Sequence, residues 1–395
     1  MAGRAEAQSR IDAVLQRAVE AGEVPGVVAL AATAAGPVYQ GAFGLRDLAQ
    51  GPAMTLDTVF RIASMTKAIT CVAAMQLVEE GRLALDAPVP DIREAALNAP
   101  LVLEGFDAAG APVLRPAKRP ITLRHLLTHT AGFTYEAWNA NTLRFVRETG
   151  MPSTQTGRLA TLRQPLGFDP GDKWEYGINI DWIGRLIEAV TGQGIDVVLR
   201  ERVLMPLGMG DTGFATSPLQ RARQASVHQR EADGRLTPQP LPEPFVPEFY
   251  AGGGGLHSTG PDYLRFLQML LRGGSLDGVR ILRRESVALM NDNHIGDLPA
   301  GVLTSYQPER SNHVDFFPGA RIRWGLGYML NLDPGPNGRQ PGTVSWAGLF
   351  NSYYWLDPAS QATGVILTQI LPFADPAAVG LYGALERGVY ALAQG

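Results

Sequence analysis

The chain has 395 residues, of which 45% are apolar and 18% are charged, and its net charge is −4. This balance is typical of a globular protein with a large core, excludes a disordered chain, and leaves room for one large or two moderate domains. The charge carries no footprint of nucleic-acid or acidic-membrane binding, and a single cysteine, Cys71, excludes an intrachain disulfide framework and a multi-thiolate zinc site.

Neither a targeting segment nor a membrane span is predicted. The first ten residues are polar and lack the apolar centre of a signal peptide. No apolar run has the length that a bilayer requires. We therefore expect a cytoplasmic protein that binds neither nucleic acid nor a membrane.

The N-terminal part of the chain predicts a helix, a hairpin and a buried helix. Residues 11–19 carry apolar side chains at helical spacing. The extended runs 27–33 and 38–43 flank a Gly-Pro turn and indicate a β-hairpin. Residues 68–78 are apolar on almost every side, which is typical of a helix inside the core.

The middle of the chain is rich in loops and otherwise helical. Helices are predicted at 123–127 and 180–190. Alternating prolines between residues 238 and 247 predict an extended loop, because proline continues neither a helix nor a central strand. Four consecutive glycines at 252–255 follow, and they let the main chain pass close to a cleft.

The C-terminal part returns to strands. Its patterns predict a helix at 263–271, strands at 343–346, 352–356 and 364–369, and a closing helix at 377–393. Because strands occur at both ends of the chain, we expect them to pair into one antiparallel sheet with the terminal helices on a face.

The predicted fold class is therefore α+β. Residues 1–90 and 250–395 are expected to form an α/β domain around the central antiparallel sheet. Residues 91–249 are expected to form an inserted, mainly helical domain with long loops. The cleft between the two domains is the expected place for a ligand.

The motif Ser64-Met65-Thr66-Lys67 stands where an extended segment gives way to the buried helix. Residues three apart share a helix face, so Ser64 and Lys67 can touch, and the free N–H groups at a helix start suit a developing oxyanion. Burial favours the neutral amine, which can accept the serine proton. The alternative is a serine N-cap followed by a lysine that reaches solvent. Roughly 0.1 such motifs are expected by chance, which favours a nucleophile and its base.

Two further motifs are candidates for the same chemistry. Tyr176 follows a Pro-Gly turn and precedes a helix, so its hydroxyl can project into a cleft and exchange protons. By itself it would be interpreted as a core tyrosine. Residues 345–350 place small side chains beside Trp346 on a predicted edge strand, where a main-chain N–H can complete an oxyanion hole with that of Ser64. The glycine of this segment alone would indicate no more than a bulge.

The three motifs resemble, in order and spacing, those of the serine β-lactamase and penicillin-binding-protein superfamily, and the resemblance covers nearly the whole chain. More narrowly, the sequence is similar to the family VIII carboxylesterases, which are class C β-lactamase-like, and to the related acyltransferase of statin side-chain biosynthesis. Supporting segments lie at 60–63, 126–132, 176–182, 206–209 and 252–256.

The departures from the superfamily pattern favour esters over β-lactams. No Lys-Thr-Gly motif, whose lysine holds the substrate carboxylate, occurs anywhere in the chain, and Trp346-Ala347-Gly348 stands in its place. The asparagine of a Tyr-x-Asn motif is replaced by Ile178. These losses disfavour β-lactams and D-Ala-D-Ala peptides, and a neutral aromatic edge favours uncharged acyl esters.

The resemblance implies a complete set of catalytic roles. Ser64 is the acylating nucleophile, Lys67 and Tyr176 together take its proton, and Tyr176 passes it to the leaving alcohol. The main-chain N–H groups of Ser64 and Leu349 form the oxyanion hole. Water activated by the same pair then releases the acid, and neither a metal nor a cofactor is needed.

The substrate-binding candidates are Trp346 and Gly348 on the edge strand, together with Tyr135. Tyr135 follows the loop that reaches the cleft in relatives. Further aromatic candidates for the acyl pocket are Trp138, Tyr353 and Trp355.

The expected function is that of a serine carboxylesterase of the EC 3.1.1 type, which hydrolyses short, uncharged acyl esters through a Ser64 acyl-enzyme. One alternative is an acyltransferase that passes the acyl group to an alcohol or amine. The other is a weak β-lactamase or penicillin-binding relative. The expected partner is a small-molecule ester, and the sequence carries no signal for an oligomeric state.

His125 and His129 stand four residues apart in a predicted helix, which is the spacing of a zinc-binding pair. The residues between them lack the glutamate of a metalloprotease motif, so helix packing and main-chain hydrogen bonds are favoured over a metal. Cys71 lies inside the apolar helix and is expected to be an inert core residue.

Overall fold

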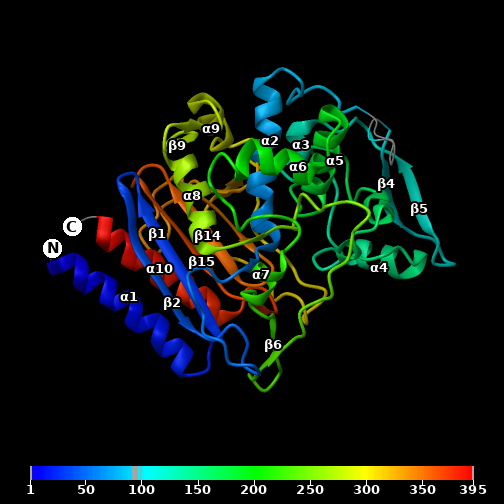
Figure 1. Cartoon of the computed structure of the whole chain (residues 1–395). Coiled ribbons are helices and arrows are strands. Elements are labelled where there is room, and N and C mark those ends of the chain that lie inside the picture. Colours follow the sequence, from blue (N-terminus) through cyan, green and yellow to red (C-terminus); the bar gives the residue numbers. More distant parts are fainter. Residues whose placement is uncertain (1, 91–96, 98, 394–395) are drawn as a thin grey trace.

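The computed structural model describes residues 2–90, 97 and 99–393, and a seven-stranded antiparallel sheet lies at its centre (Figure 1). The strand order from edge to edge is β11-β12-β13-β14-β15-β1-β2. Two strands come from the N-terminal part and five from the C-terminal part, with bounds β1 (Gly26–Thr33), β2 (Gly36–Gly44), β11 (Ile322–Trp324), β12 (Met329–Asn331), β13 (Val344–Gly348), β14 (Ser352–Asp357) and β15 (Ala362–Leu367).

Helices cover both faces of this sheet. α1 (Ala2–Glu20) and α10 (Pro376–Ala393) pack side by side on one face, and α8 (Gly260–Leu271) packs on the other (Figure 1). The N-terminal and C-terminal parts of the chain are joined within this sheet, where β1 pairs with β15.

β14 shows what two covered faces require of a strand. Trp355 packs against Tyr382 of α10, whereas its neighbour Tyr354 packs against Tyr263 of α8. Successive side chains of a strand point to opposite faces, so all six residues of β14 are buried. Between its polar ends Ser352 and Asp357, the strand is therefore a continuous apolar and aromatic run rather than an alternating one.

The middle of the chain is mostly helical and loop-rich. Its helices are α3 (Leu123–Leu127), α4 (Ala140–Thr149), α5 (Asn179–Thr191), α6 (Ile195–Leu199) and α7 (Pro218–Ala222), with 3-10 turns η2 (Thr154–Thr156) and η3 (Leu159–Arg163) and a π-helical turn η4 (Arg200–Leu204). The remaining elements are short, namely β3 (Phe60–Arg61), η1 (Ala63–Met65), β4 (Leu101–Phe106), β5 (Pro112–Pro116), β6 (His228–Arg230), β7 (Leu236–Pro238), β8 (His257–Ser258), β9 (Ser275–Leu276), β10 (Val279–Arg280), α9 (Arg284–Met290) and β16 (Ile370–Leu371).

α2 (Thr66–Glu79) occupies the centre of the molecule (Figure 1). It packs against α5, α6 and η4 of the helical part, and all of its residues are buried except Gln76, Val78 and Glu79. One continuous cluster of buried apolar residues includes both this helix and the sheet. The predicted buried helix is confirmed and begins two residues earlier than expected.

The predicted fold class is confirmed, and so are the N-terminal hairpin and the terminal helices. β15, the last strand of the central sheet, ends at Leu367, two residues before the prediction. Beyond it, the side-chain amide of Gln369 forms hydrogen bonds with both main-chain groups of Arg61. The β4–β5 hairpin and the short strands β11 and β12 were not predicted. β5 begins and ends with proline and has no buried face, so it carries no alternating pattern. The expectation that β13 is an edge strand is wrong, because β12 pairs with its first two residues.

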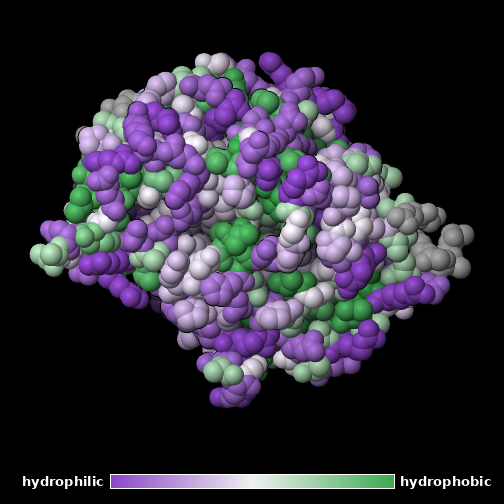
Figure 2. Space-filling model, turned by 180° about the vertical axis from the view of Figure 1, so that it is seen from behind, coloured by the Kyte–Doolittle hydropathy of each residue, from purple (hydrophilic) through white to green (hydrophobic). Residues whose placement is uncertain are grey.

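The predicted boundaries of the two domains stay a prediction. Within the residues that the structure describes, no helix is both long and apolar enough to cross a bilayer. The surface seen from behind is mostly hydrophilic, with a hydrophobic patch near its centre (Figure 2).

A buried ion pair joins the sheet to α10. The Arg339 guanidinium, in the loop before β13, contacts the Glu386 carboxylate, and both side chains are at most 1% exposed. The guanidinium also donates to Ser345 Oγ at 2.8 Å and to the Tyr382 hydroxyl at 2.5 Å. Ser345 directly precedes Trp346 on β13, so this pair supports the strand that reaches the candidate site.

The substitution Glu386→Gln removes the counter-charge and leaves a guanidinium buried. We expect the free energy of unfolding, measured with urea, to fall by about 3–5 kcal/mol. The control is Glu6→Gln, which breaks a pair whose side chains are 76% exposed at Arg10 and 64% exposed at Glu6. That change should cost about 0.5 kcal/mol or less, and equal losses in the two variants would contradict the argument.

Candidate active site at Ser64

Ser64 lies between a strand and a helix. β3 ends at Arg61, the turn η1 carries the serine, and α2 begins at Thr66. Ala63, directly before the serine, has a φ of +44°, in the left-handed region that residues other than glycine rarely adopt. Such backbone strain is concentrated at functional positions. The predicted strand-to-helix location of Ser64 is confirmed.

The Lys67 side chain is fully buried, and its amine has three polar neighbours. Nζ lies 3.1 Å from Ser64 Oγ, 3.2 Å from the Tyr135 hydroxyl and 2.6 Å from the Gly253 carbonyl oxygen. The structure therefore brings Ser64 and Lys67 into contact, as their spacing predicts.

Tyr176 faces Lys67 with its ring. Nζ lies 4.7 Å from the ring centroid, and the hydroxyl accepts a 3.0 Å hydrogen bond from the indole N–H of Trp346. Tyr176 precedes α5 and Trp346 lies on β13, so this bond joins the helical part to the sheet. All three sequence motifs meet at one place.

Tyr135 contacts the amine as well, which the sequence did not reveal. Besides its hydroxyl contact with Lys67, its ring lies 5.3 Å from that of Tyr176 and 5.8 Å from that of Trp138. Burial, and to a lesser degree the charge of Asp181, raises the pKa of Tyr135 well above its ordinary value, so the phenol stays neutral. No motif marks this contact, because the tyrosine and the lysine are 68 residues apart.

Aromatic side chains form a wall beside the amine. The Tyr176 ring lies 5.5 Å from Trp138 and 4.9 Å from Trp346, and Trp346 lies 4.7 Å from Trp324 of β11. Trp324 was not among the predicted residues, since its three-residue strand carries no motif. Two other candidates, Tyr353 and Trp355, do not join the wall, because they pack against Tyr382 of α10.

The end of β13 crosses closely over the residues that precede the nucleophile. A Cβ at Gly348 would lie 2.4 Å from the Ile62 carbonyl oxygen, so only glycine fits this approach. Among the described residues, neither the Ser64 N–H nor the Leu349 N–H donates a hydrogen bond. Both groups are therefore free to receive an acceptor atom from a ligand.

The tetraglycine segment runs along α2, as predicted for a main chain that passes close to the cleft. Thr70 Oγ1 donates to the Gly252 carbonyl at 2.7 Å, and the Leu256 N–H donates to Thr66 Oγ1 at 3.2 Å. The N–H of Gly253 donates to Asp181 Oδ1 at 2.7 Å. Asp181 was not among the predicted site residues, although it lies in the segment 176–182 that resembles the superfamily and stands between apolar neighbours in a predicted helix.

The two histidines have separate surroundings. His125 closes a capping box with Thr122 at the start of α3. His129 is buried under Tyr176, with ring centroids 4.7 Å apart, and its Nδ1 accepts from the Asn179 amide at 2.9 Å. Burial and the Lys67 charge lower the pKa of His129 well below its ordinary value. Within the described residues, no three potential metal-ligating side chains are grouped.

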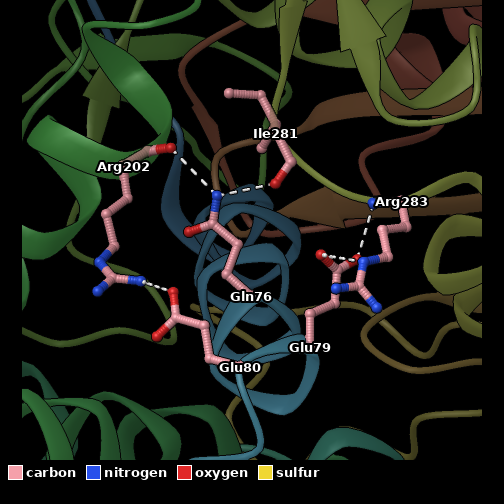
Figure 3. Close-up of a pocket in the computed structure, with 6 residues that line it drawn as sticks. All are labelled: Gln76, Glu79, Glu80, Arg202, Ile281 and Arg283. Carbon is pink, nitrogen blue, oxygen red and sulfur yellow. Dashed lines mark hydrogen bonds and ion pairs between the residues drawn. The ribbon is translucent and has the colours of Figure 1, made fainter.

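A pocket of about 260 Å³ lies at the opposite end of α2 (Figure 3). Its charged groups are already paired, since Arg202 contacts Glu80 at 2.6 Å and the Arg283 guanidinium lies 3.9 Å from Glu79, which also accepts the main-chain N–H of Arg283 at 2.7 Å. Gln76 fills the space between them by donating to the carbonyls of Arg202 and Ile281. The pocket carries no nucleophile and lies away from Ser64.

Known proteins similar to this chain include a protein family and several individual relatives. The model of the beta-lactamase family matches residues 11–388. Protein Rv1367c of Mycobacterium tuberculosis is 37% identical over 83% of this chain and 82% of its own. Monacolin J acid methylbutanoyltransferase of Aspergillus terreus is 31% identical over 96% of this chain and 95% of its own. Lovastatin esterase of Penicillium rubens is 31% identical over 96% of this chain and 98% of its own.

Solved structures with the same fold cover the full length. A mutant of simvastatin synthase from Aspergillus terreus has a TM-score of 0.84 at 31% identity and covers 99% of this chain and 98% of its own. EstCE1, described as a hydrolase with promiscuous acyltransferase activity, has a TM-score of 0.76 at 26% identity and covers 99% of this chain and 100% of its own.

The substitution Gly348→Ala tests the close approach of β13. The added Cβ must displace the Ile62 carbonyl, so we expect a loss of about 1–3 kcal/mol in unfolding free energy and slower labelling of Ser64 by a fluorophosphonate. The matched control is Gly380→Ala in α10, where a Cβ meets nothing within 4 Å. This control should gain about 0.5–1 kcal/mol. Unchanged stability and labelling in Gly348→Ala would contradict the argument.

Proposed function

The chain belongs to the beta-lactamase family, and from this premise we propose that it is a serine carboxylesterase that forms an acyl-enzyme on Ser64. The observation that carries the proposal is the 3.1 Å contact between Ser64 Oγ and the amine of the fully buried Lys67. The proposed substrates are short, uncharged acyl esters, as in family VIII carboxylesterases. A cytoplasmic location stays a prediction from the sequence.

The first step is the transfer of the Ser64 proton to Lys67. A neutral amine has two N–H donors and one lone pair. The Gly253 carbonyl can only accept a hydrogen bond, and the Tyr135 hydroxyl can accept one, so these two neighbours use the donors. The lone pair is left for the Ser64 hydroxyl, which then attacks the ester carbonyl as its proton moves to Nζ.

The negative charge of the tetrahedral intermediate is assigned to the N–H groups of Ser64 and Leu349. This role is supported by their lack of partners and by the close crossing of β13 over Ile62. Donors that are already oriented stabilise the oxyanion without a reorganisation cost during the reaction.

Tyr176 is the proposed proton donor to the leaving alcohol. Its ring flanks the amine that receives the serine proton, and the Trp346 indole N–H donates to its hydroxyl. A donated hydrogen bond favours the phenolate that remains after Tyr176 gives up its proton. The proton of Lys67 then restores the phenol, and water uses the same groups in reverse to release the acid.

The preference for uncharged acyl groups rests on the aromatic wall. Trp346 stands in the tripeptide that replaces Lys-Thr-Gly, Trp138 and Tyr135 extend the same wall, and the fully buried Trp324 packs against Trp346. No cation in this wall offers a counter-charge to a substrate carboxylate. Tyr135 is proposed both to hold Lys67 and to border the acyl group. Gly348, which has no side chain, is proposed to let the substrate approach the main chain of β13.

The second candidate is acyl transfer to an alcohol or amine. Two findings favour it, namely the relative that is a methylbutanoyltransferase and the similar structure of a hydrolase with promiscuous acyltransferase activity. The lovastatin esterase and the methylbutanoyltransferase are both 31% identical to this chain, so sequence identity does not separate the two reactions. The acyl-enzyme is common to the two reactions, so the fate of the acyl group separates them.

The substitution Ser64→Ala should lower kcat on p-nitrophenyl butyrate by at least about 10⁴-fold, because it removes the nucleophile. It should also abolish labelling by a fluorophosphonate, measured by intact mass and peptide mapping. The control is Ser217→Ala, which removes the N-cap of α7 and should keep full activity. Near-full turnover by Ser64→Ala would refute the proposed nucleophile.

The same assay with wild-type protein and an added alcohol distinguishes the products. Free butyrate alone supports hydrolysis, and a new butyrate ester supports transfer. Labelling by a fluorescent penicillin as fast as by the fluorophosphonate would instead favour the β-lactamase alternative.

Replacing the two tyrosines separately should separate their roles. Tyr176→Phe removes the proposed proton donor, and kcat should fall by about 10²–10⁴-fold. Tyr135→Phe removes only one partner of the amine, and kcat should fall by about tenfold. Steady-state kinetics with p-nitrophenyl butyrate provides both values, and a larger loss in Tyr135→Phe would reverse the assignment.

A further inference from the structure

We propose that Asp181 is a positioning residue for the amine of Lys67, because it holds the glycine that orients the amine and supplies the negative charge that faces it. The inference rests on the proposed function, since it concerns the base that activates Ser64.

The orientation of the amine depends on Gly253. The 2.6 Å contact of Nζ with the Gly253 carbonyl is shorter than its contacts with Ser64 and Tyr135, at 3.1 and 3.2 Å. A buried amine must satisfy its N–H groups with protein acceptors. The carbonyl therefore fixes one N–H and, with it, the direction of the lone pair.

Asp181 holds Gly253 from the other side. The carboxylate, in the first turn of α5, accepts the Gly253 N–H at 2.7 Å. A Cβ on Gly253 would lie 2.9 Å from Asp181 Oδ1, so the carboxylate and the glycine touch without space between them. The result is a chain of two hydrogen bonds from α5 through Gly253 to α2.

The charges of Asp181 and Lys67 also interact. The residue is only 6% exposed, and burial raises its pKa, while the Lys67 charge and the Gly253 N–H lower it. Charge coupling is reciprocal, so an ionised Asp181 favours the ammonium that forms when Lys67 takes the serine proton. The other titratable groups that face or respond to the amine are Tyr135, Tyr176, His129 and Cys71. None of these four described groups is a carboxylate, so Asp181 supplies the carboxylate of the set.

A purely structural role for Asp181 predicts different behaviour. An acidic residue in the first turn of a helix stabilises that helix through its dipole. Loss of such a residue lowers stability but leaves the pH dependence of the folded enzyme unchanged. Asp262 is a matched case, since it is buried in the first turn of α8 and accepts hydrogen bonds from the Asp211 N–H and the Thr212 hydroxyl.

The test compares Asp181→Asn with Asp262→Asn in the full chain. The asparagine keeps an oxygen for the Gly253 N–H and removes the charge. We expect kcat on p-nitrophenyl butyrate to fall about 10- to 100-fold with little change in KM. The acidic limb of the pH profile of kcat/KM should move to lower pH, because loss of a nearby anion disfavours a buried cation. Asp262→Asn should leave the limb unmoved.

Gly253→Ala is a second variant, in which the Asp181 carboxylate is kept but is displaced by the added Cβ. This variant should have a lower kcat. The acidic limb of its pH profile of kcat/KM should lie closer to that of Asp181→Asn than to that of the wild type. If both Asp181→Asn and Gly253→Ala keep the wild-type limb, or lose activity only in proportion to the folded fraction seen by thermal unfolding, the proposal is overturned. Should Asp181→Asn not fold, Gly253→Ala decides alone.

Labelling of Ser64 keeps this inference separate from the proposed function. If the wild-type protein is not labelled at Ser64 by the fluorophosphonate, the proposed function fails. If it is labelled, and Asp181→Asn is labelled at the same rate with the same pH dependence, only the role of Asp181 fails.

Discussion

The structure depends on one buried amine. Lys67 lies inside the protein with no exposed surface, and an amine removed from water must find its hydrogen-bond partners within the chain. One partner, Ser64, is three residues away, and the other two, Tyr135 and Gly253, come from distant segments of the chain. Because each segment must reach the same atom, the burial of one side chain determines how the helical part of the chain meets α2.

The second constraint is the close approach of main chains around Ser64. Ala63 adopts a positive φ, and the Ile62 carbonyl leaves no room for a side chain at Gly348. Local strain of this kind persists only where the surroundings hold it. β13 is held from behind, since the buried Arg339 joins Ser345 of this strand to Glu386 of α10. The sheet thus acts as the rigid support on which the candidate oxyanion hole is built.

The proposed acylating pair and the aromatic wall come from different parts of the chain. The proposed nucleophile Ser64 lies in the turn η1 and the amine of Lys67 in α2, which follows directly, so the pair needs only a spacing of three residues. The wall opposite them is formed by side chains from β11, β13 and the loops before α4 and α5. A cation in place of Trp346 would change the charge of that wall and leave the contact between Ser64 and Lys67 untouched. Relatives named as an esterase and as a transferase are consistent with such a division.

The sequence by itself determined the fold class, the central helix and the Ser64–Lys67 pair, because periodicity and short spacings are local properties of the chain. Tyr176 and Trp346 were also identified from motifs, although their mutual hydrogen bond joins residues 170 positions apart. Only the tertiary structure decided that Tyr135 touches the amine, that Trp324 joins the aromatic wall, that Tyr353 and Trp355 face α10 instead, and that Asp181 reaches Lys67 through Gly253. Such contacts depend on how helices and strands pack in three dimensions, and no local pattern records which distant side chains will share one buried space.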